Sequence, residues 1–112
     1  MKTAGKFGVL ERLNAKSAQG LIRALNEPLN IVGIGIDEER VDEETGEIKP
    51  CTYFVCDDGK LFTAISPTVR EVAEDMIETF NGEVSSIGIV AMSRTNKSGD
   101  RDYIVINVTD IK

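Results

Sequence analysis

The stretch YFVCDDGKLFTAISPTVREVAEDMIETFNG, from Tyr53 to Gly82, decides the fold of this chain. Its first part falls in two runs of strand-forming residues, which we place at 50–57 and 60–65. Asp58-Gly59 lies between them, and this dipeptide favours a two-residue type I′ turn. Such a turn fixes the register of the hairpin, so we expect three opposed pairs: Val55 with Phe62, Tyr53 with Ala64, and Cys56 with Leu61.

The same stretch continues into an amphipathic helix. Ser66-Pro67 supplies a serine N-cap followed by a proline at the first helical position. Apolar side chains then recur at helical spacing up to Phe80, and Asn81-Gly82 is typical of a C-cap. The apolar positions are Val69, Val72, Ala73, Met76, Ile77 and Phe80. A hairpin followed directly by a helix is therefore the centre of the predicted fold.

Strand-like segments flank this centre on both sides. One precedes the hairpin at 29–37, and two follow the helix at 84–93 and 103–109. The resulting order, β-β-β-α-β-β, is that of the OB-fold, a five-stranded Greek-key barrel with a helix between strands three and four. We therefore predict a mainly β protein with helices, folded as a single OB-fold domain over residues 1–112.

Residues 1–27 form an N-terminal strand and helix extension of this barrel. Apolar residues at alternate positions predict a strand over 6–15, and Ser17 is a candidate N-cap for a short helix over 17–25. The strand that follows carries Gly33 and Gly35. Two explanations for these glycines remain open, a sharp bend of the barrel or the close approach of another backbone or a ligand.

The predicted register divides the hairpin into two faces. The interior face carries Thr52, Phe54, Cys56, Leu61 and Ile65, and the outer face carries Tyr53, Val55, Phe62 and Ala64. Tyr53 and Phe62 lie on neighbouring strands, within reach of adjacent bases of a single-stranded nucleic acid. Both rings could instead pack under the N-terminal extension, and the sequence leaves the two explanations open.

The charge distribution bears on nucleic-acid binding in two ways. The chain has 13 basic and 19 acidic residues, a net charge of −6, which argues against binding by overall charge. Much of the acidity lies in the run 37–47, an expected hairpin loop, and on the solvent side of the helix. A basic loop at 94–102, which could also be a solvated turn, precedes the last strand. The candidate nucleic-acid-binding residues are Tyr53, Phe62, Lys60, Arg94, Lys97, Arg101 and Tyr103.

The sequence does not indicate an enzyme. It has no histidine, no recognisable pair of nucleophile and base, and no phosphate-binding motif. Cys51 and Cys56 lie five residues apart on one strand, so their side chains point to opposite faces and cannot bridge each other. We predict no catalytic residues, no cofactor and no metal site. Without a long apolar run or a secretory pattern, we expect a cytoplasmic protein.

Three motifs resemble one family. They are the run FVCDDGKLFTAISPTVREVAEDMI at 54–77, the turn NKSGDRDY at 96–103 and the terminal strand IVINV at 104–108. The chain is similar here to the small single-stranded-DNA-binding proteins of protein-primed bacteriophages of Gram-positive hosts, and to related mobile-element proteins. The resemblance implies an OB-fold, a DNA-binding aromatic at Phe62, and basic contacts from Lys97 and Arg101. It also implies tyrosines in and just after the strand at 29–37, where this chain has glycine and acidic residues.

The leading hypothesis is therefore sequence-independent binding of single-stranded DNA, which protects or organises displaced strands during phage or mobile-element replication in a bacterial host. RNA, replication or recombination proteins and a second copy of the chain are further possible partners, and no membrane is expected. The alternative is a protein-interaction module whose acidic loop and helix dock a replication, recombination or conjugation partner. A third hypothesis combines the two, with the N-terminal extension swapping between copies or polymerising along DNA.

Overall fold

The computed structural model describes residues 1–81 and 84–112 of a mainly β chain with helices. Its strands are β1 (Lys2–Gly5), β2 (Gln19–Gly20), β3 (Pro28–Asp37), β4 (Cys51–Cys56), β5 (Leu61–Ala64), β6 (Ile87–Thr95) and β7 (Asp102–Ile111). The helices are α1 (Val9–Asn14) and α2 (Pro67–Phe80), and two 3₁₀ turns, η1 (Ala15–Ser17) and η2 (Leu21–Ala24), lie between α1 and β3.

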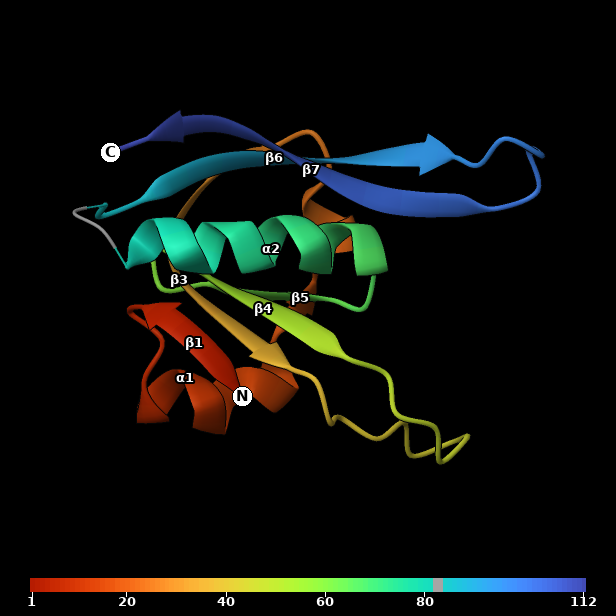
Figure 1. The fold of residues 1–112 in the computed structure, drawn as a ribbon, viewed down its shortest axis with the longest axis horizontal. Coiled ribbons are helices and arrows are strands. Elements are labelled where there is room, and N and C mark those ends of the chain that lie inside the picture. Colours follow the sequence, from red (N-terminus) through yellow and green to blue (C-terminus); the bar gives the residue numbers. More distant parts are fainter. Residues whose placement is uncertain (82–83) are drawn as a thin grey trace.

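The described strands form one curled sheet in the order β2-β5-β4-β3-β6-β7, with β1 beside β3. The first half of β3 pairs with β6 and its second half with β1, and the change of partner coincides with a register shift in the β3–β4 pairing between Ile31 and Gly33. α2 lies between the β6–β7 hairpin and the part of the sheet formed by β1, β3 and β4 (Figure 1). Among the described strands β5 and β7 are not paired, so the sheet is a curled half-barrel that stays open there.

The main core lies between the curled sheet and α2. The Ser66 hydroxyl accepts a hydrogen bond from the backbone N–H of Val69 at 3.4 Å, so the predicted N-cap is confirmed. The helix buries Val69, Ala73, Met76 and Phe80 in one cluster with Phe54 and the isoleucines of β3 and β6. Gly82, the second residue of the predicted C-cap, lies outside the described residues.

The hairpin of β4 and β5 is present, but the predicted register is wrong by one residue. Phe54 lies opposite Phe62 and Val55 lies opposite Leu61. The cause is the turn, since the N–H of Cys56 donates to the Lys60 carbonyl at 2.9 Å and leaves a three-residue loop. Gly59 has φ +89° while Asp58 has none of the positive φ that a type I′ turn requires. The loop is therefore a type I turn with a glycine bulge, and it moves Phe62 from the outer face into the core.

The N-terminal extension also differs from its prediction. Residues 6–15, expected to form a strand, contain α1, while the strand β1 lies earlier and pairs with β3. Gly5 ends β1 at φ +65°, and the side chain of Glu11 accepts a hydrogen bond from the N–H of Gly8 at 3.0 Å to start α1. The helix expected over 17–25 is instead two 3₁₀ turns on either side of β2. Buried Leu21 and Ala24 stand three residues apart, which matches the 3₁₀ period.

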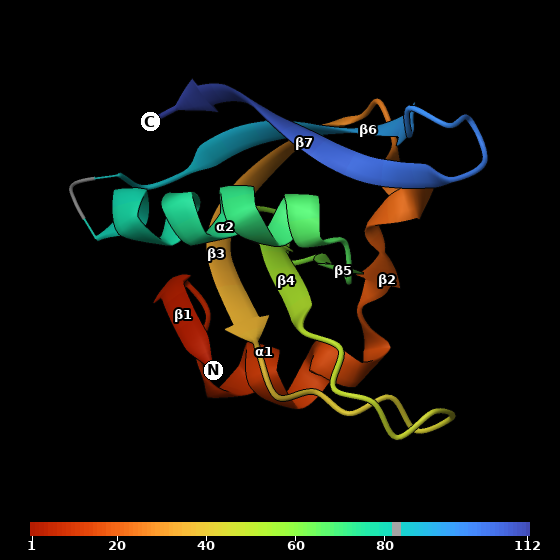
Figure 2. The same cartoon turned by 45° about the vertical axis from the view of Figure 1, so that its right-hand side comes forward.

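This extension covers the outer face of the sheet. Phe7 packs on Tyr53 with the ring centroids 6.3 Å apart, and Cys51 and Val55 complete a second, smaller buried cluster. From α1 the chain then runs along β5 towards β6 (Figure 2). A Cβ on Gly33 would lie 2.7 Å from the carbonyl carbon of Lys6, so the glycine permits the close approach of another backbone. Of the two explanations for this glycine, the structure supports the second.

The acidic run forms the hairpin loop that was predicted between β3 and β4. Val41 and Ile48 pair across it, and Gly46 stands at its tip with φ +72°. An ion pair of 3.0 Å between Lys49 and Asp42 holds the two arms together and lowers the pKa of the Asp42 carboxyl. Within the described residues, none of the helices has the length and apolar character that crossing a bilayer requires.

Candidate nucleic-acid interface

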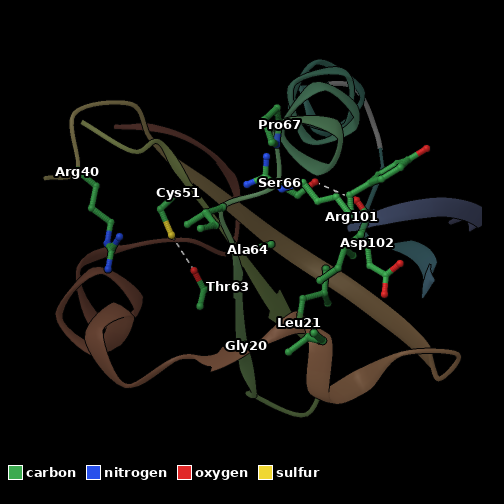
Figure 3. Close-up of a pocket in the computed structure, with 14 residues that line it drawn as sticks. Gly20, Leu21, Arg40, Cys51, Thr63, Ala64, Ser66, Pro67, Arg101 and Asp102 are labelled. Carbon is green, nitrogen blue, oxygen red and sulfur yellow. Dashed lines mark hydrogen bonds between the residues drawn. The ribbon is translucent and has the colours of Figure 1, made fainter. Parts of the chain in front are cut away.

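A groove lies where the sheet stays open, between β5 and the first half of β7. Its volume is about 700 Å³. The end of β5 and the start of α2 form one wall, and the start of β7 forms the other (Figure 3). Gly20 of β2 and Leu21 and Ile22 of η2 also line the groove. The hydroxyl of Ser66 donates to the Ile104 carbonyl at 2.9 Å and ties these two walls together. The groove is thus a consequence of the incomplete closure of the barrel.

The lining of the groove is largely apolar, and part of it is exposed. Ile22 of η2 and Ile65 after β5 are 64% and 58% exposed, although both are large aliphatic residues. Tyr103 at the start of β7 is 39% exposed. Tyr103 pairs with Arg94 on the face of the hairpin opposite to Ile104, so its ring lies at the edge of the groove. An exposed aromatic ring there is a surface on which a nucleobase can stack.

Two arginines lie on opposite sides of this groove. In Figure 3 Arg40 and Arg101 are separated by the contact of the Cys51 sulfur with the Thr63 hydroxyl, which measures 2.7 Å. The salt bridges of the described residues all involve lysines, so neither guanidinium is paired with a described carboxylate. Asp102 is the acidic residue of the lining, and its carboxylate accepts a hydrogen bond from the Thr95 hydroxyl at 2.8 Å. The groove therefore combines an apolar surface with two cations that are available to an anion.

The loop that carries Arg101 is held by its own polar side chains. Ser98 and Asn96 donate hydrogen bonds to one oxygen of Asp100 at 2.6 and 3.0 Å. These bonds lower the pKa of the Asp100 carboxyl, whose charge is thus satisfied within the loop. The exposed residues Lys97 and Arg101 are consequently presented on an ordered turn.

The predicted stacking pair is not on the surface. Tyr53 is 7% exposed and lies under Phe7, and Phe62 is 5% exposed and lies in the main core. Burial, with a smaller contribution from Cys51, raises the pKa of the Tyr53 hydroxyl to about 12. The prediction that these two rings form an exposed platform is therefore wrong for the described conformation, because of the register shift and the N-terminal cover.

The other predicted residues fall into two groups. Arg94 is the cross-strand partner of Tyr103, so both side chains lie on the same face of the β6–β7 hairpin. Lys97 and Arg101 lie in the turn that joins the two strands of this hairpin. Lys60 lies elsewhere, in a separate hollow beside the N-terminal extension, with its ammonium 3.9 Å from Asp58. The structure thus pairs Arg94 with Tyr103 on strands joined by the turn that carries Lys97 and Arg101, and it leaves Lys60 apart. Of the four, Arg101 and Tyr103 line the groove.

Sequence reasoning missed the rest of the groove. Arg40 stands in an acidic run and Ile22 and Ile65 had been placed in a helix and in the interior, respectively. The signal that could have found Arg40 is its position as the one basic residue between the strand and the tip of the acidic loop.

The described residues contain no cluster of potential ligands that could hold a metal ion. Among protein-family models, curated proteins and solved structures, none matches this chain.

Proposed function

We propose that this protein binds single-stranded DNA without sequence preference, in the groove between β5 and β7. The observation that carries the proposal is that exposed apolar side chains and two arginines line the same groove, and that neither arginine has a described carboxylate partner. The residues are Tyr103, Ile22, Ile65, Arg40 and Arg101. Bases would stack on Tyr103 and contact the isoleucines, while the two guanidinium groups would bind phosphates on either side. A groove of this kind suits unpaired bases, because a duplex keeps its bases stacked inside.

The connections of the sheet support the same proposal. β3 pairs with both β4 and β6, β4 pairs with β5, α2 follows β5, and β6 pairs with β7. We infer from this order an OB-like fold in which the contact between the third and fifth strands of the barrel is opened. OB-folds bind oligonucleotides on the face of their second and third strands and with the loops that follow the first and the fourth strand. In the proposed order these two loops carry Arg40 and Arg101.

The negative net charge is compatible with this site because the acidic residues are unevenly placed. Glu71, Asp75 and Glu78 are exposed on α2, and six further acidic residues lie in the loop between β3 and β4: Glu38, Glu39, Asp42, Glu43, Glu44 and Glu47. The basic residues Arg94, Lys97 and Arg101 are in or beside the β6–β7 turn instead. Local potential rather than net charge governs the approach of a phosphate backbone.

Fluorescence anisotropy with a labelled oligo-dT at low salt tests the proposal. We expect saturable binding that is weakened by Arg40→Ala and by Arg101→Ala. Each variant should also reduce the salt slope, which is the slope of log affinity against log salt concentration, by about 0.7 per lost phosphate contact. Tyr103→Ala should cost about 1–3 kcal/mol of binding free energy if a base stacks on the ring. Arg12→Ala is the matched control, since it removes the same charge from exposed α1, away from the groove. Absence of saturable binding, or an equal effect of Arg12→Ala and Arg101→Ala, would contradict the proposal.

The biological process is proposed from the sequence resemblance. The motifs at 54–77 and 96–108 resemble phage and mobile-element proteins that coat displaced strands, so we propose the same role in the cytoplasm of a bacterial host. The carried-over role of Lys97 and Arg101 is retained in this proposal. The role of Phe62 is not retained, because its ring is buried in the core.

A further inference from the structure

A second hollow adjoins the groove on the side of the acidic loop. Its volume is about 620 Å³, and it shares Arg40, Cys51 and Thr63 with the groove. Because the same three residues line both spaces, the two spaces are adjacent, and a strand that left the groove beside Arg40 would reach this hollow next. The hollow and the groove are therefore two consecutive parts of one surface.

The N-terminal extension supplies the other cation of this hollow. Lys16 belongs to η1, which precedes β2, and β2 pairs in parallel with β5 at Gln19 and Phe62. This pairing places η1 close to β5, whose residue Thr63 lines the same hollow as Lys16. Lys16 is exposed and, like Arg40, forms no salt bridge with the described carboxylates.

Two carboxylates face the same hollow from the acidic loop. Glu43 and Glu44 line it opposite the N-terminal extension, and the N–H of Glu44 donates to Asp42 at 2.9 Å, which fixes the backbone there. They reduce the positive potential that Lys16 and Arg40 create. Any anion in the hollow must therefore bind against this repulsion.

We propose that the hollow is a second phosphate-binding position on the path of the single strand, formed by Lys16 and Arg40 and weakened by Glu43 and Glu44. The inference rests on the proposed function, because the ligand is the phosphodiester backbone of the strand bound in the groove. It assigns to the N-terminal extension a contact with the nucleic acid that the barrel alone does not provide. The position lengthens the footprint of the protein on the strand.

Anisotropy titrations with two oligo-dT lengths test this assignment. Roughly 4 and roughly 16 nucleotides bracket the site sizes of single OB-folds, so the shorter probe fills the groove and the longer one also reaches the hollow. We expect Lys16→Ala to weaken binding of the longer probe and to lower its salt slope by about 0.7, with little effect on the shorter one. The double variant Glu43→Gln/Glu44→Gln should bind the longer probe more tightly than wild type.

Arg12→Ala again serves as the matched control, since Arg12 lies on the same extension outside this lining. If Lys16→Ala and Arg12→Ala behave alike on the longer probe while Arg101→Ala weakens both probes, the second position is wrong and the groove stands. Unchanged affinity in the Glu43→Gln/Glu44→Gln variant also overturns the second position. If wild type binds neither probe, the proposed function fails and this inference fails with it. Thermal unfolding of each variant confirms that these exposed substitutions leave the fold intact.

Discussion

The ring of Phe7 lies directly against the backbone of Gly35: a Cβ atom on that glycine would stand 2.7 Å from the ring carbons Cε1 and Cζ. This contact fastens the N-terminal extension to the outer face of the sheet, where Phe7 also packs on Tyr53. A side chain at position 35 and a ring at position 7 therefore exclude each other. The extension occupies a face that would otherwise present Tyr53 to solvent.

Gly35→Ala should destabilise the protein by about 1–3 kcal/mol, the usual cost of adding a methyl group to a filled core. The cost should largely vanish in a Phe7→Ala background, because the double variant removes the colliding ring. Urea unfolding of wild type, the two single variants and the double variant measures the coupling free energy between positions 7 and 35. Gly8→Ala is the control, since a Cβ there meets only the Glu11 carboxylate, at 3.8 Å. Additive effects of the Gly35 and Phe7 changes would contradict the proposed contact.

Stability should fall at alkaline pH through Cys56 and Tyr53. Burial raises the pKa of the Cys56 thiol from 9.0 to about 11 and that of the Tyr53 hydroxyl from 10.0 to about 12. The unfolded chain therefore loses each proton at a lower pH than the folded chain does. As the pH rises through each interval, deprotonation stabilises the unfolded chain first, so the free energy of unfolding falls. Urea midpoints across this pH range check the prediction. Tyr53→Phe should flatten the decline above pH 10.0, and an unchanged decline would contradict it.

Thr52→Val should raise the free energy of unfolding by about 1 kcal/mol, because a buried hydroxyl without a partner loses its hydration. Thr52 is 1% exposed, and within the described part of the chain its hydroxyl has no hydrogen-bond partner. Chemical denaturation measures the change. Thr63→Val is the comparison, since its hydroxyl contacts the Cys51 sulfur at 2.7 Å and its replacement should bring no such gain. A destabilised Thr52→Val protein would show that the hydroxyl is satisfied.

Ser66→Ala should cost about 1–2 kcal/mol as the loss of a helix N-cap. The same hydroxyl donates to Ile104 at 2.9 Å, so its loss also loosens the two walls of the groove. Hydrogen exchange of the Val69 amide should speed up together with that of amides at the start of β7. Ser17→Ala, which removes an exposed local hydrogen bond to Asn14, should leave both unchanged. Faster exchange confined to α2 would mean that the hydroxyl does not tie the walls.

The sequence was most informative where local chemistry alone determines structure. Ser66-Pro67 and the apolar spacing after it predicted α2, which indeed begins at Pro67 and ends at Phe80. The register of the hairpin could not be predicted in this way. Asp58-Gly59 is compatible with a two-residue turn and with a type I turn followed by a glycine bulge, and the second allows Phe62 to join Phe54 in the core.

The N-terminal extension was harder still, because its structure depends on distant partners. Phe7 is buried by residues far away in the chain, among them Gly35 and Tyr53, and β2 is formed by its pairing with β5. The candidate site was predictable to the extent that Arg101 and Tyr103, which line it, lie on the predicted basic hairpin together with Arg94 and Lys97. Arg40, Ile22 and Ile65 join it from three separate segments, and no local pattern reports that meeting.

Backbone amide chemical shifts during titration with unlabelled oligo-dT test the central claim most directly. If the single strand lies in the groove between β5 and β7, the largest shifts should cluster at Ile22, Arg40, Ile65, Arg101 and Tyr103. Amides on the exposed face of α2 and on α1 should remain where they are. Saturating shifts centred on α2 or α1, or none in the groove, would contradict the account.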